Sequence, residues 1–198
     1  MGMDQRKVNM LARDYVKSVM ANDSGNKKKR KKNKRKQQTL YPPVVISHHM
    51  LMGLKQKKKE NETEESKGEI IKMSKSDPDS AIFMEDSADD VRRKIKKGYA
   101  EPCVVEKNPI LDYCKHIVFG KFDTFEVKRS GKNGGNKVYK SYEEVENDYK
   151  SGALHPGDLK PSLADAINEM IEPVRQHFKN DKRAKKLLAQ VKKFRVTK

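Results

Sequence analysis

A chain of 198 residues is long enough for one medium domain or two small ones. Hydrophobic residues make up only 34% of it and charged residues 37%, so any core must be small. Lys and Arg number 45 against 28 Asp and Glu, and the resulting net charge of +17 favours a polyanionic partner, most simply RNA. No apolar run approaches the ~18 residues that span a membrane, and the N-terminus lacks the apolar centre of a signal peptide. These features predict a cytosolic protein that has no membrane partner.

The cysteines and histidines do not form a pattern typical of a metal site. Cys103 and Cys114 are too few and wrongly spaced for a zinc knuckle or a disulfide framework, and they fit a reducing compartment. The adjacent His48 and His49 have no Cys or acidic cluster beside them in the sequence. We therefore expect no metal ion held by protein side chains.

The first quarter of the chain predicts a helix, a charged loop and a strand. Residues 4–20 contain no Gly or Pro and predict an amphipathic helix, with these apolar residues at helical spacing on its core-facing side: Val8, Leu11, Ala12, Tyr15 and Val19. Residues 27–36 hold nine positive charges, which typify a solvated loop; added RNA affinity and a nuclear-localisation patch remain open alternatives. The apolar run 44–46 predicts a short, fully buried strand of the kind found in parallel sheets.

The rest of the chain predicts mostly helices. Helical patterns cover the ranges 86–99, 108–120, 141–152, 160–178 and 181–194. Between the second and third of these, residues 123–140 show apolar alternation on both sides of a Gly/Asn turn, which predicts a hairpin. Capping boxes are predicted at Ser87 with Asp90 and at Ser141 with Glu144. Pro173 is expected to kink or break the fourth helix.

The stretch "GEIIKMSKSDPDS", residues 68–80, combines lysines and serines in a way that suits phosphate. Lys72 and Lys75 alternate with Ser74 and Ser76. A flexible loop of this composition brings ammonium groups and hydroxyl or backbone donors around a polyphosphate, whose charge redistributes in the transition state. By charge alone, a solvated lysine loop is the simpler interpretation, because such loops are common in this chain.

Six sequence segments, in the same order as in a known family, favour the phosphate-binding interpretation of this loop over the solvated one. The string "KMSKS" at 72–76 is the signature loop of class I aminoacyl-tRNA synthetases, and the chain closely resembles the tyrosyl-tRNA synthetases of the eukaryotic and archaeal type. The resemblance covers nearly everything outside the two charged stretches. It runs through "GMDQRKVNMLARDY", "SHHMLMGL", "KMSKSDPDSAIF", "DVRRKIKKGYAEP", "GGNKVYKSYEEVENDY" and "LHPGDLKPSLADAINEMIEPVR".

The resemblance implies a fold and an activity. The expected fold class is α/β: a partial, Rossmann-like nucleotide-binding parallel sheet, followed by a mostly α-helical anticodon-binding domain. Residues 1–84 would belong to the catalytic domain, with charged insertions at about 22–38 and 55–67, and residues 85–198 to the anticodon-binding domain. The implied activity is a tyrosine–tRNA ligase, which uses ATP with Mg²⁺ to form tyrosyl-adenylate and transfers tyrosine to tRNA(Tyr). The complete enzyme is expected to be a homodimer.

The resemblance also assigns residues to the catalytic site. Lys72, Ser74 and Lys75 take the catalytic role on the ATP phosphates. Gln5 would help hold the amino group of tyrosine. Many relatives of this type carry Ser in place of Lys75, so that lysine follows the broader class I pattern. The complete set expected to contact ATP is Met50, Leu51, Lys72, Met73, Ser74, Lys75 and Ser76.

The anticodon-binding residues implied by the resemblance are Asn133, His155 and Asp158. A histidine ring can stack on a splayed base while a carboxylate accepts a hydrogen bond from its amino edge. Asn133 stands where relatives often have an aromatic residue; asparagine can hydrogen-bond but offers no comparable π face. On local pattern alone, an ordinary turn and helix cap is the simpler interpretation of "HPGD".

Three hypotheses therefore remain open from the sequence. The family's catalytic domain begins well before "MDQRK", and its "HIGH"-type histidines and tyrosine pocket have no counterpart in these residues. The chain is expected to be the C-terminal part of a tyrosine–tRNA ligase. The alternative is a truncated or vestigial tRNA-binding module without autonomous catalysis. A basic ribosomal-type RNA-binding protein, in which nothing depends on "KMSKS", is the third hypothesis.

Overall fold

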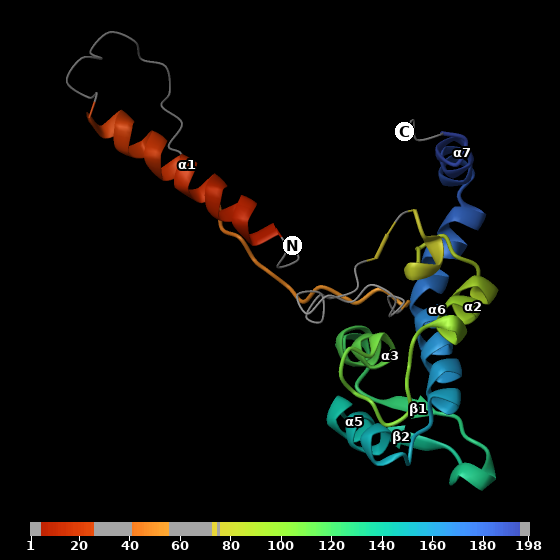
Figure 1. The fold of residues 1–198 in the computed structure, drawn as a ribbon. Coiled ribbons are helices and arrows are strands. Elements are labelled where there is room, and N and C mark those ends of the chain that lie inside the picture. The colour runs from red at the N-terminus through yellow and green to blue at the C-terminus, as the bar shows by residue number, and fades with distance from the viewer. Residues whose placement is uncertain (1–4, 26–40, 56–72, 75, 195–198) are drawn as a thin grey trace. The chain divides into compact units, whose positions relative to one another are not determined.

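A computed structural model describes residues 5–25, 41–55, 73–74 and 76–194 of the chain (Figure 1). The chain divides into two compact units, Met1–Met50 and Leu51–Lys198, and each is described by itself. Most of the two charged stretches at 22–38 and 55–67 lies outside the described residues. No helix in the described ranges has the length and apolarity needed to cross a bilayer.

The first unit contains helix α1 (Arg6–Gly25) and the segment 41–50. Arg13 Nη1 donates a hydrogen bond to the carbonyl of Pro43 at 2.6 Å, which joins the two pieces. The predicted helix is confirmed, but its assignment to a core is wrong, because Tyr15 is 68% exposed. An amphipathic face is buried only when an opposing layer covers it, and the described residues of this unit supply only the irregular segment 41–50.

The buried strand expected at 44–46 is also wrong. The segment is irregular, with Val44 85% exposed and Ile46 79% exposed. A strand forms when its backbone groups pair with a neighbour, and the described residues of the first unit contain no second strand. The Rossmann-like parallel sheet thus has no counterpart among the described residues.

The second unit is mostly helical. Its helices are α2 (Ala88–Lys97), α3 (Pro109–Tyr113), α4 (Phe119–Lys121), α5 (Tyr142–Ser151), α6 (Pro156–Asn180) and α7 (Lys182–Val191). A π-helical segment, Cys114–Val118, joins α3 to α4, and short 3₁₀ turns occupy Pro78–Ser80 and Gly131–Asn133. The strands are β1 (Phe125–Val127) and β2 (Lys137–Tyr139). The mostly helical character expected of this part of the chain is therefore present, while its boundary at 84/85 stays a prediction.

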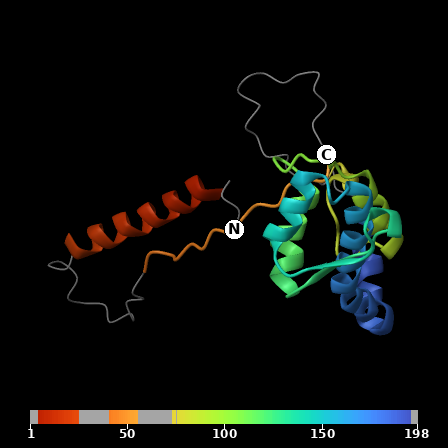
Figure 2. The ribbon, with the colours of Figure 1, turned by 90° about the horizontal axis from the view of Figure 1, so that it is seen from below.

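The hairpin predicted at 123–140 is confirmed. Strands β1 and β2 pair antiparallel, with Phe125 opposite Tyr139 and Val127 opposite Lys137. Helix α6 packs against β1 and α2, and α5 packs against β2, so the hairpin is covered by helices (Figures 1 and 2). The core between these elements is formed by buried aromatic and aliphatic side chains, among them Ile95, Leu111, Tyr113, Val127, Tyr139, Tyr149, Leu159 and Leu163.

The caps of two helices differ in outcome. Ser87 caps α2 as predicted, since its Oγ accepts from the amide of Asp90 at 3.1 Å. The capping box at Ser141 is wrong: the Ser141 side chain makes no cap bond at the start of α5. Instead, Glu144 Oε2 accepts from the amide of Lys140 at 2.9 Å, one residue before the expected partner. Sequence spacing alone did not distinguish these two amides.

Helix α6 is longer at its start than predicted and is not broken by proline. It begins at Pro156 rather than near residue 160, and it continues through Pro161 and Pro173 to Asn180. Each internal proline removes one donor from the helix, which costs stability. Of the expected kink or break at Pro173, the break is wrong and the kink stays a prediction. Helix α6 continues past this proline because it is held by its packed face, whose buried residues include Leu159, Leu163, Ile167 and Ile171.

Candidate functional site

His155 is the N-cap of helix α6 and lies exposed at the surface. Its Nδ1 accepts a hydrogen bond from the amide of Gly157 at 3.0 Å. Because Nδ1 is the acceptor, the neutral ring carries its proton on Nε2, which can donate to a ligand. A Cβ added to Gly157 would lie 3.0 Å from His155 Nδ1, which is closer than ordinary van der Waals contact. Glycine at position 157 therefore avoids a steric clash with the imidazole ring.

Asp158 follows in the first turn of α6, where a carboxylate is favoured by the helix dipole. Its Oδ2 accepts from Asn133 Nδ2 at 2.9 Å. Asn133 is the last residue of the short 3₁₀ turn Gly131–Asn133. The carbonyl of Ser130 accepts hydrogen bonds from the amides of Asn133 and Gly135, at 2.9 and 3.0 Å. The turn is followed by Gly134 and Gly135, whose φ values of +88° and +72° favour glycine.

The structure thus brings together the three residues that the sequence assigned to one base. Asn133 contacts Asp158 directly, and His155 stands three residues before Asp158 at the same helix end. A carboxylate has about four acceptor sites, so the bond from Asn133 leaves Asp158 able to accept from a ligand as well. Together the site offers a ring face, an imidazole N–H donor and a carboxylate acceptor, which is a set that can read a base edge. Their role in binding an anticodon stays a prediction.

Arg129 supports this site and was not found from the sequence. Its Nε donates to the carbonyl of Gly135 at 2.8 Å, and its Nη1 donates to the carbonyl of Ala153 at 3.1 Å. The guanidinium therefore links the hairpin turn to the loop that leads into His155. No local motif marks this arginine, because its two acceptors are six and 24 residues away in the chain.

The described part of the signature loop is organised around Ser80. Of the residues predicted to contact ATP phosphates, Met73, Ser74 and Ser76 are described and exposed, while Lys72 and Lys75 lie outside the described residues. The buried Ser80 Oγ accepts from the amide of Ser74 at 2.9 Å and donates to the carbonyl of Asp77 at 2.6 Å. The hydroxyls of Ser74 and Ser76 are 2.7 Å apart. This network shapes the C-terminal half of the loop.

Two aspartates connect the loop to its surroundings. Asp77 Oδ1 pairs with Lys55 Nζ at 2.6 Å, and Asp79 Oδ1 pairs with Arg93 Nη1 of α2 at 2.8 Å. The hydrogen bond from Arg93, with the positive charges of Arg93 and Lys97, lowers the pKa of Asp79 despite its partial desolvation. Asp79 is therefore ionised at neutral pH and holds the turn Pro78–Ser80 against α2.

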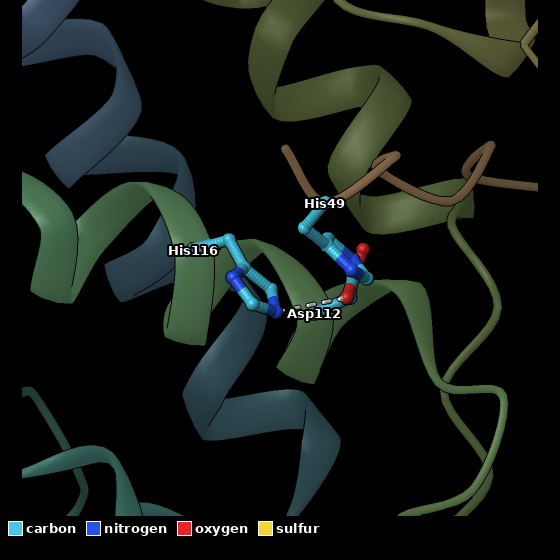
Figure 3. Close-up of side chains that lie close together, drawn as sticks. All are labelled: His49, Asp112 and His116. Atoms are coloured by element: carbon cyan, nitrogen blue, oxygen red, sulfur yellow. Dashed lines mark ion pairs between the residues drawn. The ribbon is translucent and has the colours of Figure 1, made fainter. Parts of the chain in front are cut away.

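The remaining predicted site residues fall on both sides of the division between the units. Gln5 and Met50 belong to the first unit, and Leu51 opens the second, where it packs against the core. The next residue, Met52, donates its amide to Asp112 Oδ2 at 3.0 Å. Asp112 in turn lies 3.7 Å from the ring of His116 one helical turn on (Figure 3). The structure thus shows how Leu51 is anchored in its own unit; contact with ATP stays a prediction for both Met50 and Leu51.

The second unit combines described residues of the "KMSKS" loop with Asn133, His155 and Asp158 at the start of α6, which is the combination that the resemblance to class I tRNA synthetases predicts. The family model described as tRNA synthetases class I (W and Y) matches residues 1–172, and the chain belongs to this family. Within the family it is of the eukaryotic and archaeal tyrosyl type, as its similar proteins show.

Among curated proteins, the chain is 49% identical over 197 residues to "Tyrosine--tRNA ligase 1, cytoplasmic" of Arabidopsis thaliana, covering 100% of this chain and 43% of the relative. It is 36% identical to "Tyrosine--tRNA ligase" of Saccharolobus solfataricus, covering 97% of this chain and 48% of the relative. The chain therefore spans less than half the length of these relatives.

Solved structures give the same family. The tyrosyl-tRNA synthetase of Pyrococcus horikoshii complexed with L-tyrosine matches with a TM-score of 0.74 and 34% identity, over 96% of this chain and 50% of that one. The Leishmania major tyrosyl-tRNA synthetase in complex with fisetin matches with a TM-score of 0.68 and 36% identity, over 96% of this chain and 28% of that one.

Proposed function

We propose that this chain supplies the phosphate loop and the anticodon-binding region of a tyrosine–tRNA ligase. The enzyme activates tyrosine with ATP and Mg²⁺ to tyrosyl-adenylate, and transfers the tyrosyl group to tRNA(Tyr). The observation that carries this proposal is the bond between Asn133 and Asp158 at the helix end that His155 caps, in a chain 49% identical to a tyrosine–tRNA ligase. We assign it to the cytoplasm, after the name of that relative, and to a homodimer in its complete form.

The loop acts on the triphosphate. Lys72 and Lys75 neutralise charge that develops on the phosphate oxygens as tyrosine attacks the α-phosphorus and pyrophosphate leaves. Ser74 and Ser76 add hydroxyl donors from the stretch that Ser80 organises. Met50 and Leu51 contact the adenine ring, and Gln5 binds the amino group of tyrosine. Residues 1–84 accordingly serve in catalysis and residues 85–198 in anticodon binding.

The anticodon site acts on the tRNA. The His155 ring stacks on the first anticodon base, and the Asp158 carboxylate accepts from the amino edge of that base. The side-chain amide of Asn133 donates a hydrogen bond to the Asp158 carboxylate. It occupies the position at which relatives often have an aromatic residue that stacks on the base. Loss of His155 or Asp158 is therefore expected to weaken tRNA charging and to leave adenylate formation nearly unchanged.

A second candidate, a tRNA-binding module without autonomous catalysis, is favoured by the exposed apolar side chains of the first unit. Val8, Leu11 and Tyr15 of α1, together with Val44 and Ile46, are exposed among the described residues. Such a surface is expected to be covered in a working catalytic domain. In this candidate the chain retains the anticodon site and does not activate tyrosine.

Tyrosine-dependent exchange of pyrophosphate into ATP separates these candidates. Exchange by the chain alone would exclude the binding-only candidate. Exchange that appears only when the part of the Arabidopsis relative outside the matched region is added would indicate an enzyme assembled from two pieces. No exchange in either case, together with binding of tRNA(Tyr), would support the binding module.

The same assay tests the loop in whichever form is active. Lys72→Ala and Lys75→Ala are expected to lower the exchange rate at least about tenfold, because each removes a cation from the transition state. Lys185→Ala on α7 serves as the control with the same change of charge. Unaltered exchange in both loop variants would remove the phosphate role.

A further inference from the structure

A cavity of about 760 Å³ lies between α2 and the first turns of α6, beside the residues assigned to the anticodon base. Its volume falls inside the roughly 300–1,000 Å³ typical of ligand sites. His155 is part of its lining, while Asn133 and Asp158 are not. The cavity therefore adjoins the proposed base-reading set and shares one residue with it.

Three cations line this cavity against one carboxylate. Arg92 and Lys96 come from α2 and Lys160 from α6, and the carboxylate is that of Asp165. Arg92 Nη2 lies 3.3 Å from Asp165 Oδ1, so that pair is largely compensated. Lys160 and Lys96 carry the excess positive charge. The cavity thus favours an anion.

The position of Lys160 is set by one hydrogen bond. Its Nζ donates to the backbone carbonyl of Lys96 at 3.2 Å, which holds the Lys160 side chain against the last turn of α2. Burial lowers the pKa of Lys160. A half-buried ammonium that has given up part of its hydration gains more from an arriving phosphate than a fully solvated one does.

Apart from His155, the rest of the cavity lining is apolar. Pro102 and Pro161 are exposed and line it together with Ala100 and Ala164. Proline side chains present flat hydrocarbon surfaces and offer no backbone N–H that would compete for a base. A site that joins cations to flat apolar surfaces matches a nucleotide, which has an anionic phosphate and a planar base.

We propose that this cavity binds a second nucleotide of the single-stranded tRNA loop, a neighbour of the nucleotide read by His155 and Asp158. Its phosphate contacts Lys160 and Lys96, and its base packs on Pro102 and Pro161. This inference rests on the proposed anticodon site and extends it by one nucleotide. Because phosphate contacts carry no sequence information, Lys160 contributes affinity, while Asp158 contributes discrimination between bases.

The test uses the full 198-residue chain and an RNA hairpin whose loop carries the tyrosine anticodon. Lys160→Met keeps the length of the side chain and removes its charge, and is expected to weaken binding about tenfold at low salt. It should also lower the slope of log affinity against log salt by about 0.7, the value for one phosphate contact on a single strand. Lys160→Arg should restore both quantities.

Two further measurements exclude a merely structural effect. Lys185→Met makes the same change on α7, beyond the far end of a 25-residue helix, and should leave affinity almost unaltered. Replacing single loop phosphates with neutral methylphosphonates should identify one phosphate whose loss weakens binding to the native chain. The same replacement should have no further effect on Lys160→Met.

The possible outcomes separate this inference from the function beneath it. If Asp158→Ala weakens the hairpin and Lys160→Met and Lys96→Met do not, the second nucleotide is overturned and the anticodon site stands. Both lysine variants could weaken binding while every methylphosphonate weakens Lys160→Met as much as it weakens the native chain. In that case the cavity acts only by general charge, and the inference fails. If the native chain does not bind the hairpin, both proposals fail together.

Discussion

The side-chain amide of Asn133 donates to the carboxylate of Asp158 at 2.9 Å, which joins the turn of the β-hairpin to the first turn of α6. The two residues are 25 positions apart, and the bond holds the carboxylate beside His155. Asn133 thus has a structural task that an aromatic side chain would not perform. In the proposed anticodon site, we therefore expect base reading to depend on the oriented Asp158 carboxylate rather than on a stacking platform at Asn133.

Asn133→Ala is expected to lower affinity for the anticodon hairpin about fivefold, because losing one hydrogen bond to a charged group at the surface costs about 1 kcal/mol. Discrimination against a hairpin with an altered first anticodon base should fall as well. Asn147→Ala on the exposed face of α5 is the matched control. Unchanged discrimination in Asn133→Ala would show that Asp158 needs no orientation by Asn133.

Lys94 forms the most buried ion pair among the described residues. Its Nζ lies 2.6 Å from Asp86 Oδ2, donates to the carbonyl of Ala81 at 3.0 Å, and stands 4.5 Å from the centre of the Phe83 ring. Arg175 of α6 donates to the carbonyl of Asp86 at 2.8 Å. The segment that leaves the signature loop is thereby held between α2 and α6.

Lys94→Met is expected to lower the free energy of unfolding by about 3 to 5 kcal/mol, because it leaves the Asp86 carboxylate buried without its counterion. Urea unfolding followed by circular dichroism measures the change. Lys96→Met, two residues along on an exposed position, should cost under about 0.5 kcal/mol. Adding Asp86→Asn should recover much of the loss; a further loss of several kcal/mol in the double variant would mean that the pair is not the cause.

Ser80→Ala is expected to free the loop at Ser74 without unfolding the helices. The substitution removes the acceptor of the Ser74 amide and one donor to the Asp77 carbonyl, and that carbonyl still accepts from the Ser80 amide at 2.9 Å. Amide hydrogen exchange at Ser74 should accelerate about tenfold, and exchange in α6 should stay the same. Ser18→Ala on α1 is the control. Equal acceleration throughout the second unit would instead indicate global destabilisation.

Local signals predicted the elements that depend on neighbours in sequence. Ser87 caps α2 because the cap and its amide partner are three residues apart, and the hairpin follows from its glycine turn and apolar alternation. The grouping of Asn133 with Asp158 came from resemblance to a family, since no local pattern relates residues on separate elements. Only the folded second unit shows that they touch.

Long-range partners explain what sequence reasoning missed. Three such features depend on how α2, α6 and the hairpin pack: the ion pair of Lys94 with Asp86, the hydrogen bonds of Arg129 and the cavity beside Lys160. In so basic a chain, a single lysine or arginine in the sequence does not indicate which partner it has. The prediction of a buried strand at 44–46 was wrong because it assumed a long-range partner from a local pattern. An apolar run shows that a segment can be buried, but it does not show whether the layer that would bury it is present.

Asp148 provides a test by pH of the contact between β2 and α5. Its Oδ2 accepts from Lys137 Nζ at 2.6 Å and from the Tyr139 hydroxyl at 2.9 Å. Burial raises the pKa of Asp148, but the bonds from Lys137 and Tyr139 and the nearby positive charges outweigh it, so that the pKa lies below its ordinary value of 3.8. Folding therefore favours the ionised carboxylate. The resulting stabilisation is complete above the ordinary pKa and is lost as the pH falls through the lowered one.

Asp148→Asn keeps the shape and an acceptor for Tyr139 but removes the charge that Lys137 meets. The variant should be less stable than the native chain near neutral pH, and the difference should shrink as the pH falls below about 4. Urea unfolding across this range measures it, with Asp123→Asn at an exposed position as the control. Should the gap between Asp148→Asn and the native chain stay constant down to the lowest pH at which the chain folds, the charge of Asp148 does not stabilise the hairpin.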